Sequence, residues 1–126
     1  MKRITAAQIA PVRAALAAKQ GHLCPLCGGS IKAGNKKPAL DHDHQTGQVR
    51  DVLCLNCNGM EGKIFNLARR GLKGQEPLFL ERILQYWKRH AEDQHGMIHP
   101  THKTDDEKRL ARNAKARKRR AAAKKA

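Results

Sequence analysis

The chain has 126 residues and a formal net charge of +15, with 26 Lys and Arg against 11 Asp and Glu. This length allows one small domain, or one domain with a tail. The positive excess indicates a polyanionic partner, either nucleic acid or an acidic membrane surface. No apolar run is long enough to span a bilayer, and residues 1–5 lack the apolar stretch of a secretory signal. We therefore expect an intracellular protein with no membrane partner.

Residues 4–20 predict a helix with two candidate start points. Thr5 and Gln8 have the spacing of a capping box, but a helix that begins there has Pro11 in its interior. A start near Pro11 avoids that clash, because proline is tolerated in the first turn. Gly21 is typical of the residue that follows the end of a helix.

Two Cys-x-x-Cys pairs flank the centre of the chain, Cys24 with Cys27 and Cys54 with Cys57. Each such turn presents two thiolates, and two turns together complete a tetrahedral structural zinc site. Disulfides or unrelated thiols are the alternatives, but the absence of a secretion signal favours zinc. With one Trp, one Tyr and two Phe, the domain has few large apolar side chains. We expect the metal to supply folding free energy that so small a core lacks.

Between the cysteine pairs, two short extended segments flank a turn at Thr46 and Gly47. The first segment ends with Leu40-Asp41-His42, and the second, residues 49–53, alternates between apolar and polar side chains. Together they predict a β-hairpin.

Two amphipathic helices are predicted after the second cysteine pair. Met60, Ile64 and Leu67 lie four and three residues apart, and a helix carrying them ends near Gly71. A linker with Gly and Pro follows. The most regular amphipathic pattern of the chain is then formed by Leu80, Ile83, Leu84 and Trp87.

The C-terminal segment differs in composition from the rest. Residues 103–126 hold eleven Lys and Arg against three acids; they have the Ala and Lys/Arg content of a potential helix but no apolar face. We therefore predict a disordered basic tail after a domain of residues 1–102. Such a tail is expected to bind DNA without sequence preference, through counterion release.

Four consecutive residues, Asp41 to His44, are all Asp or His. These residues have poor strand propensity and are costly to bury unpaired, which favours a functional role. The zinc site would bring them close to the helix start that carries Asn58 and Glu61.

These side chains suit the hydrolysis of a phosphodiester. The reaction needs a base for the attacking water, and histidine suits that role, so we predict His42 as the general base. It also needs a cation to stabilise charge on the phosphate, and we predict Asp41 and Asn58 as oxygen ligands of Mg²⁺ or Mn²⁺. His44 and Glu61 are candidate supporting residues, with a solvated loop histidine and a surface helix residue as the alternatives.

Asp41 and His42 are neighbours, and neighbouring side chains of a regular strand point to opposite faces. Both can address one phosphate only where the strand ends or twists. We therefore expect an irregularity at this point of the hairpin.

Several motifs together resemble the recombination endonuclease VII family of bacteriophages, within the wider His-Me finger, or HNH-like, nucleases. They occur in the family's order and cover roughly residues 20 to 100, which is more specific than any single motif. The motifs are Leu40 to His44, Val49-Arg50 through Leu53-Cys54, Cys57-Asn58 with Glu61-Gly62, Gly71 to Gln75, and Ile98-His99-Pro100. The resemblance implies a small α+β fold, a ββα-metal core with a structural zinc and flanking helices.

The family's activity, carried onto matching positions, implies Mg²⁺-dependent cleavage of branched DNA such as Holliday junctions. The implied zinc ligands are Cys24, Cys27, Cys54 and Cys57. The implied catalytic residues are Asp41 and Asn58 as metal ligands, His42 as general base, and His44 and Glu61 in support.

The resemblance also implies an intertwined homodimer, built partly by helices at residues 59–70 and 77–91. Packing of these helices onto their own domain is the alternative. A phage-encoded member would act in the cytoplasm of the infected bacterial host. After His99 the chain departs from the family's junction resolvase, because a basic tail stands where the resolvase has a further domain.

Two other hypotheses stay open on sequence grounds. A general HNH nuclease that cuts or nicks ordinary duplex DNA would use the same residues. A non-catalytic zinc module that binds nucleic acid explains the charge and the cysteines, but not the Asp and His run beside Asn58.

Overall fold

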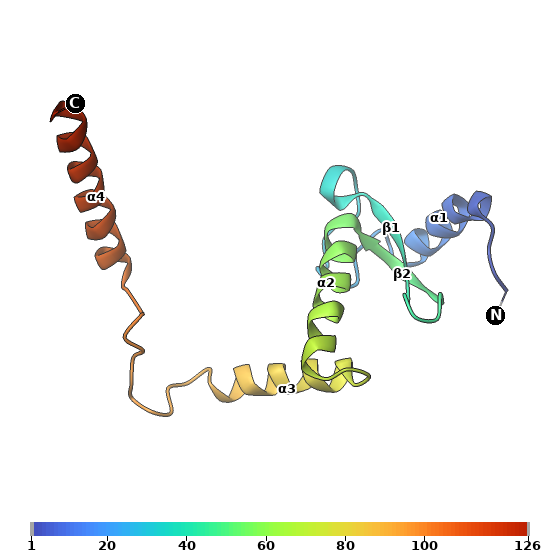
Figure 1. Ribbon diagram of the computed structural model, residues 1–126. Coiled ribbons are helices and arrows are strands. Elements are labelled where there is room, and N and C mark those ends of the chain that lie inside the picture. Colours follow the sequence, from blue (N-terminus) through green and yellow to red (C-terminus); the bar gives the residue numbers. More distant parts are fainter. Residues whose placement is uncertain (1, 126) are drawn as a thin grey trace. The chain divides into compact units, whose positions relative to one another are not determined.

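The structure, a computed structural model, describes residues 2–125. Contacts divide the chain into two compact units, Met1–Tyr86 and Trp87–Ala126. The first unit holds α1 (Ile9–Lys19), β1 (Pro38–His42), β2 (Val49–Cys54) and α2 (Leu55–Gly71), shown in Figure 1. The boundary between the units falls within α3 (Glu76–Arg89), and α4 (Asp105–Lys125) belongs to the second. None of the helices described is long and apolar enough to cross a membrane.

Helix α1 begins two residues before the expected start at Pro11. The 3-10 turn η1 (Ala6–Gln8) leads into it, and the Thr5 backbone N–H donates to Gln8 Oε1 at 2.8 Å. Pro11 is the third residue of α1, where a backbone N–H would have no partner within the helix. The capping residues and the proline are therefore both accommodated. Gly21 follows the helix with φ of 62°, as expected after a helix C-terminus.

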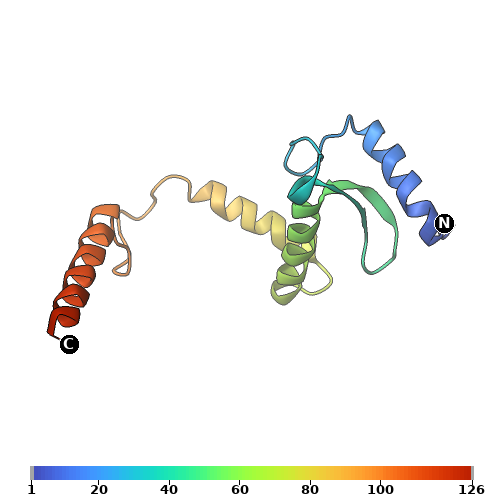
Figure 2. The same cartoon turned by 90° about the horizontal axis from the view of Figure 1, so that it is seen from above.

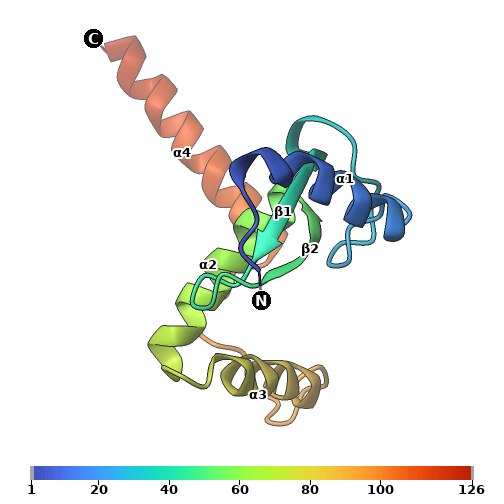
Figure 3. The same ribbon diagram turned by 90° about the vertical axis from the view of Figure 1, so that its right-hand side faces the viewer.

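The two strands pair antiparallel in the predicted hairpin, with Pro38 opposite Cys54 and Leu40 opposite Val52. The hairpin lies between α1 and α2, and each helix contacts both strands (Figures 1 and 2). Figure 3 shows α1 in front of the hairpin. Helix α2 follows β2 directly, and the Cys54 sulfur caps it by accepting from the Cys57 backbone N–H at 3.4 Å. This ββα unit confirms the predicted small α+β fold.

Gln20, at the end of α1, is hydrogen-bonded to β2 through its side-chain amide. Its Nε2 donates to the Val52 carbonyl at 2.7 Å, and its Oε1 accepts from the Val52 N–H at 2.8 Å. The amide thus satisfies both backbone polar groups of Val52, which is fully buried. This pair fixes α1 to the outer edge of the hairpin.

The buried core is small, as the scarcity of large apolar side chains predicts. Cys24, Cys54 and Cys57 form its main cluster together with Leu53, and Ile31 packs against them. Three of the four cysteines are therefore core residues, so the arrangement of the sulfur atoms and the packing of the domain depend on each other.

Glu76 fixes the corner between α2 and α3. This residue is 5% exposed, and its carboxylate accepts from the Gly74 backbone N–H at 3.0 Å and pairs with Arg69 Nε at 3.6 Å. The hydrogen bond from Gly74 lowers the pKa of Glu76. At the same corner, a Cβ on Gly71 would lie 2.4 Å from Phe79 Cζ, so the two helices meet where only glycine fits.

Residues 105–125, which we expected to be disordered, form helix α4 instead. Thr104 and Glu107 form a reciprocal capping box, with hydrogen bonds of 2.8 and 3.2 Å. Lysine and arginine side chains one turn on pair with acids of the first turn, as Lys108 does with Asp105. Capping, ion pairs and many alanines favour a helix without an apolar face. A domain boundary between residues 102 and 103 stays a prediction.

Candidate functional site

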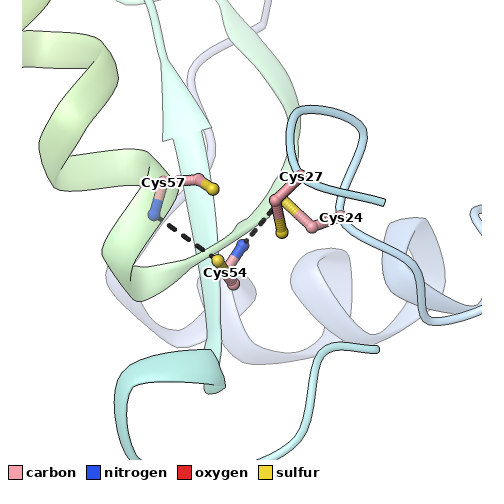
Figure 4. Close-up of side chains that lie close together, drawn as sticks. All are labelled: Cys24, Cys27, Cys54 and Cys57. Atoms are coloured by element: carbon pink, nitrogen blue, oxygen red, sulfur yellow. Dashed lines mark hydrogen bonds between the residues drawn. The ribbon is translucent and has the colours of Figure 1, made fainter. Parts of the chain in front are cut away.

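The four cysteines converge on one point of the first unit. Cys24 and Cys27 come from the loop after α1, Cys54 ends β2, and Cys57 lies in the first turn of α2. Their sulfur atoms all lie within 4.8 Å of one another (Figure 4). Sulfurs around a tetrahedral Zn²⁺ with bonds of about 2.3 Å are roughly 3.8 Å apart. The cluster therefore fits a single structural zinc ion, as predicted.

The pKa values of the clustered cysteines show why the cluster favours binding of a cation. Burial raises the pKa of Cys24, but backbone N–H groups of Cys27, Cys54 and Leu26 outweigh it and lower the pKa to about 6. A hydrogen bond with Cys54, together with burial, raises the pKa of Cys57 to about 12. The four cysteines are therefore not all deprotonated in the absence of a cation, because their negative charges repel one another. A divalent ion bound among them stabilises the four thiolates.

Lys36 lies beside this cluster and was not singled out by the sequence. It belongs to the 3-10 turn η2 (Gly34–Lys36), and its Nζ lies 3.4 Å from Cys27 Sγ and 3.7 Å from Cys54 Sγ. Its hydrogen bond to Cys27 raises the pKa of Lys36. Because four thiolates around Zn²⁺ retain two excess negative charges, the ammonium group offsets part of them.

A β-bulge interrupts the hairpin at Asp41. Leu40 pairs with Val52 and His42 pairs with Val49, so Asp41 alone lies opposite Arg50 and Asp51. This confirms the irregularity expected here. Asp41 is 6% exposed, whereas His42 is exposed to solvent. A bulge redirects side chains locally, and here it sets Arg50 against Asp41.

Arg50 links three elements through its guanidinium group. Its Nε donates to Asp41 Oδ2 at 2.6 Å and its Nη2 to Asp41 Oδ1 at 3.0 Å. The same Nη2 lies 3.1 Å from Glu61 Oε2 on α2. These hydrogen bonds, that to Asp41 first, raise the pKa of Arg50. The structure thus gathers two of the predicted carboxylates, Asp41 and Glu61, around one cationic group.

The two predicted histidines lie side by side. The rings of His42 and His44 are stacked, with centroids 4.9 Å apart and planes inclined by 5°. Between them, Asp43 Oδ1 accepts backbone N–H bonds from Gln45 at 2.8 Å and Thr46 at 2.9 Å. These bonds, that from Thr46 first, lower the pKa of Asp43. Asp43 therefore shapes the turn that holds the two rings together.

Comparison with known families bears directly on this site. The sequence model of one family, described as recombination endonuclease VII, matches residues 2–89. The chain belongs to the recombination endonuclease VII family. It is accordingly a nuclease that hydrolyses phosphodiester bonds, and family membership implies DNA as its substrate. The matched segment contains the cysteine cluster, the hairpin and α2.

A shallow pocket of about 120 Å³ opens beside the Asp and His run of this endonuclease. Its walls include His44, Arg50, Glu61, Asn66 and Arg69. Asn58 is half-buried in the first turn of α2. The pairing of Asn58 with Asp41 as metal ligands stays a prediction.

Proposed function

We propose that this endonuclease is a Mg²⁺- or Mn²⁺-dependent enzyme that cuts branched DNA such as Holliday junctions. The observation that carries the proposal is the convergence of Asp41 and Glu61 on one cationic group, next to an exposed histidine pair. Metal-assisted phosphodiester hydrolysis needs carboxylate oxygens that can bind a cation and an accessible base beside them, and these residues supply both.

Asp41 and Asn58 would hold the metal ion. Both supply oxygen atoms, which Mg²⁺ prefers, and Asp41 comes from a buried position where a carboxylate needs a cationic partner. The guanidinium of Arg50 now plays that part, at 2.6 and 3.0 Å from the two carboxylate oxygens. A bound divalent ion supplies charge that stabilises the phosphate and the leaving oxygen.

His42 acts as the general base in this proposal. Its exposed ring accepts a proton from the attacking water while a new P–O bond forms and the bond to the leaving oxygen breaks. His44, stacked on His42 at 4.9 Å, limits the orientations of that ring. Glu61 supports the site through Arg50, to which it is paired at 3.1 Å.

DNA binding draws on the charge of the whole chain. The formal net charge of +15 attracts the DNA phosphates electrostatically. Most of the cationic residues of the C-terminal segment lie on α4. Sequence-independent contacts of this kind fix the enzyme on phosphates and leave specificity to the shape of the substrate.

A homodimer would place one active site on each of two strands. An apolar groove of about 410 Å³ supports this part of the proposal; Leu26, Met60, Ile64, Phe65 and Leu80 are among its lining residues. Ile64 is 48% exposed and Leu67 on the same helix is 58% exposed. A second copy is the occupant we propose, because exposed apolar patches of this kind mark association surfaces.

The test compares a labelled four-way junction with a linear duplex of the same sequence. The zinc-loaded protein is assayed with Mg²⁺ and in metal-depleted buffer, beside His42→Ala; depletion is used because a strong chelator would also remove zinc. Mg²⁺-dependent cutting that favours the junction and is lost in the variant supports the proposal. Equal cutting of both substrates would leave a general duplex nuclease. Absence of cutting by folded protein that binds DNA would leave a non-catalytic zinc module.

A further inference from the structure

Arg50 occupies both oxygen atoms of the carboxylate that the proposed metal needs. Its Nε donates to Asp41 Oδ2 at 2.6 Å, and its Nη2 donates to Asp41 Oδ1 at 3.0 Å. The same Nη2 lies 3.1 Å from Glu61 Oε2. A metal ion at an Asp41 oxygen would share the charge of this carboxylate with Arg50 and would lie next to a second cation, which is unfavourable. Metal binding is therefore opposed by this pair and favoured by its release.

We propose that Arg50 is a positioning residue that competes with the divalent cation for Asp41, and that a DNA phosphate relieves the competition by drawing the guanidinium away. The inference rests on the proposed metal-dependent function. It makes binding of metal and of DNA mutually favourable, because whichever ligand arrives first removes part of the obstacle to the other. By thermodynamic linkage, DNA raises the affinity for the metal by the same factor by which the metal raises the affinity for DNA.

The position of Arg50 allows the exchange. Its side chain is 37% exposed, against 8% for that of Asp41, so the arginine rather than the aspartate has access to solvent. Among the described residues its hydrogen bonds run through Nε and Nη2, which leaves Nη1 for an anion. Arginine binds phosphate in the same two-point manner as carboxylate.

The anion has a place to bind. Arg50 lines the pocket of about 120 Å³ together with the basic residues His44 and Arg69, beside two acidic residues, Asp43 and Glu61. Arg69 is paired with Glu76 at 3.6 Å and not with Asp41. It therefore offers a matched control: it is a cation of the same pocket that does not hold the metal-ligand carboxylate.

The experiment measures Mn²⁺ affinity directly, by electron paramagnetic resonance of the free ion, using zinc-loaded full-length protein. The background is His42→Ala, so that added junction DNA stays uncut. Arg50→Met keeps an unbranched side chain and removes the charge, and Asp41→Ala reports binding elsewhere. We expect Arg50→Met to bind Mn²⁺ about tenfold more tightly than the parent without DNA. DNA should tighten Mn²⁺ binding by a similar factor in the parent and by little in Arg50→Met.

The control Arg69→Met should weaken DNA binding and leave Mn²⁺ affinity without DNA unchanged. A merely structural role for Arg50 gives the opposite sign, because loss of a supporting pair weakens the metal site. Equal or weaker Mn²⁺ binding by folded Arg50→Met, or an unchanged effect of DNA, overturns the inference. Where Arg50→Met fails to fold, Arg50→Lys carries the test: it keeps the charge but loses the two-point pair, and should still bind Mn²⁺ more tightly than the parent.

Failure of the underlying function has a different signature. In that case the parent binds no Mn²⁺ with or without DNA, and protein with intact His42 cuts nothing. Metal-dependent cutting with unchanged Mn²⁺ affinity in the Arg50 variants leaves the function standing and removes only the competition.

Discussion

Arg50 and Asp41 form a two-point ion pair across the bulge of the hairpin, with N···O distances of 2.6 and 3.0 Å. Arg50→Ala leaves the Asp41 carboxylate, 6% exposed at the residue level, without its cationic partner. Because Arg50 is itself partly exposed, we expect a loss of about 1–3 kcal/mol in unfolding free energy and not the larger loss of a fully buried pair. Urea unfolding of zinc-loaded protein measures it.

Arg70→Ala is the control for this prediction, since Arg70 is an exposed residue of α2. A surface change of this kind should stay within about 0.5 kcal/mol of the parent. Equal stability of the two variants would show that water solvates the Asp41 carboxylate as well as Arg50 does. The ion pair would then contribute little to the free energy of unfolding.

The sequence predicted the parts of this site that depend on local spacing. The cysteine pairs, the hairpin and the helix after Cys57 each follow from residues a few positions apart. The Arg50 link was not predictable in the same way, because it depends on one extra residue in β2 that shifts the register opposite Asp41. Lys36 was missed for a related reason: no spacing rule connects a loop lysine to a distant thiolate.

Helix α4 shows a different limit. The expectation of disorder rested on the lack of an apolar face, which is the usual source of helix stability in a folded domain. It did not weigh the Thr104–Glu107 capping box, although both residues are visible in the sequence. Capping hydrogen bonds, ion pairs and helix propensity each contribute little free energy, and they stabilise a helix only when many of them act together, as they do here.

Acidification should release zinc from the cysteine cluster. In the folded state the pKa of Cys24 is lowered from 9.0 to about 6, so this thiolate contributes stability that is fully present above the unfolded value. That contribution declines as the pH falls and is lost through the folded value. This pKa belongs to the cluster without its metal, and bound zinc keeps the thiolates deprotonated to a lower pH, so we expect zinc loss, with loss of structure, below about pH 6. A zinc indicator and far-UV circular dichroism follow the two events.

His22→Gln is the control, because His22 lies two residues before Cys24 and an imidazole nitrogen is itself a possible zinc ligand. The transition should persist in this variant if thiolates are responsible. Zinc retained until general acid unfolding of the carboxylates would contradict the prediction.

Lys36→Met should weaken zinc binding by up to about tenfold, at the lower end of what changes next to metal ligands cause. The variant removes a positive charge that lies 3.4 Å from Cys27 Sγ and 3.7 Å from Cys54 Sγ. Competition with a chromophoric chelator gives the affinity. Lys37→Met is a matched control, since it removes an equal charge from the adjacent exposed residue. Equal effects of the two variants would reduce the role of Lys36 to general electrostatics.

Two glycines of α2 should respond to alanine in opposite directions. A Cβ on Gly71 meets the Phe79 ring at 2.4 Å, so Gly71→Ala should destabilise the protein by about 1–3 kcal/mol. A Cβ on Gly59 meets nothing within 4 Å, so Gly59→Ala should stabilise it by about 0.5–1 kcal/mol. Thermal unfolding measures both. Stabilisation by Gly59→Ala with loss of DNA cleavage would show that DNA approaches the backbone there.

The cations of α4 should set the salt dependence of DNA binding. Replacing the four consecutive residues Arg117 to Arg120 by glutamine removes up to four phosphate contacts from an exposed helix. Each contact contributes about 0.9 to the slope of log affinity against log salt, so the slope should become shallower by about 3 to 4 when all four bind. Fluorescence anisotropy with a labelled junction, over a series of salt concentrations, measures it. Glutamine at Ala121, Ala122 and Ala123 is the control, because it alters the same helix without changing its charge. A slope unchanged by the loss of the four cations would place α4 away from the DNA and assign the electrostatic affinity to residues 2–89.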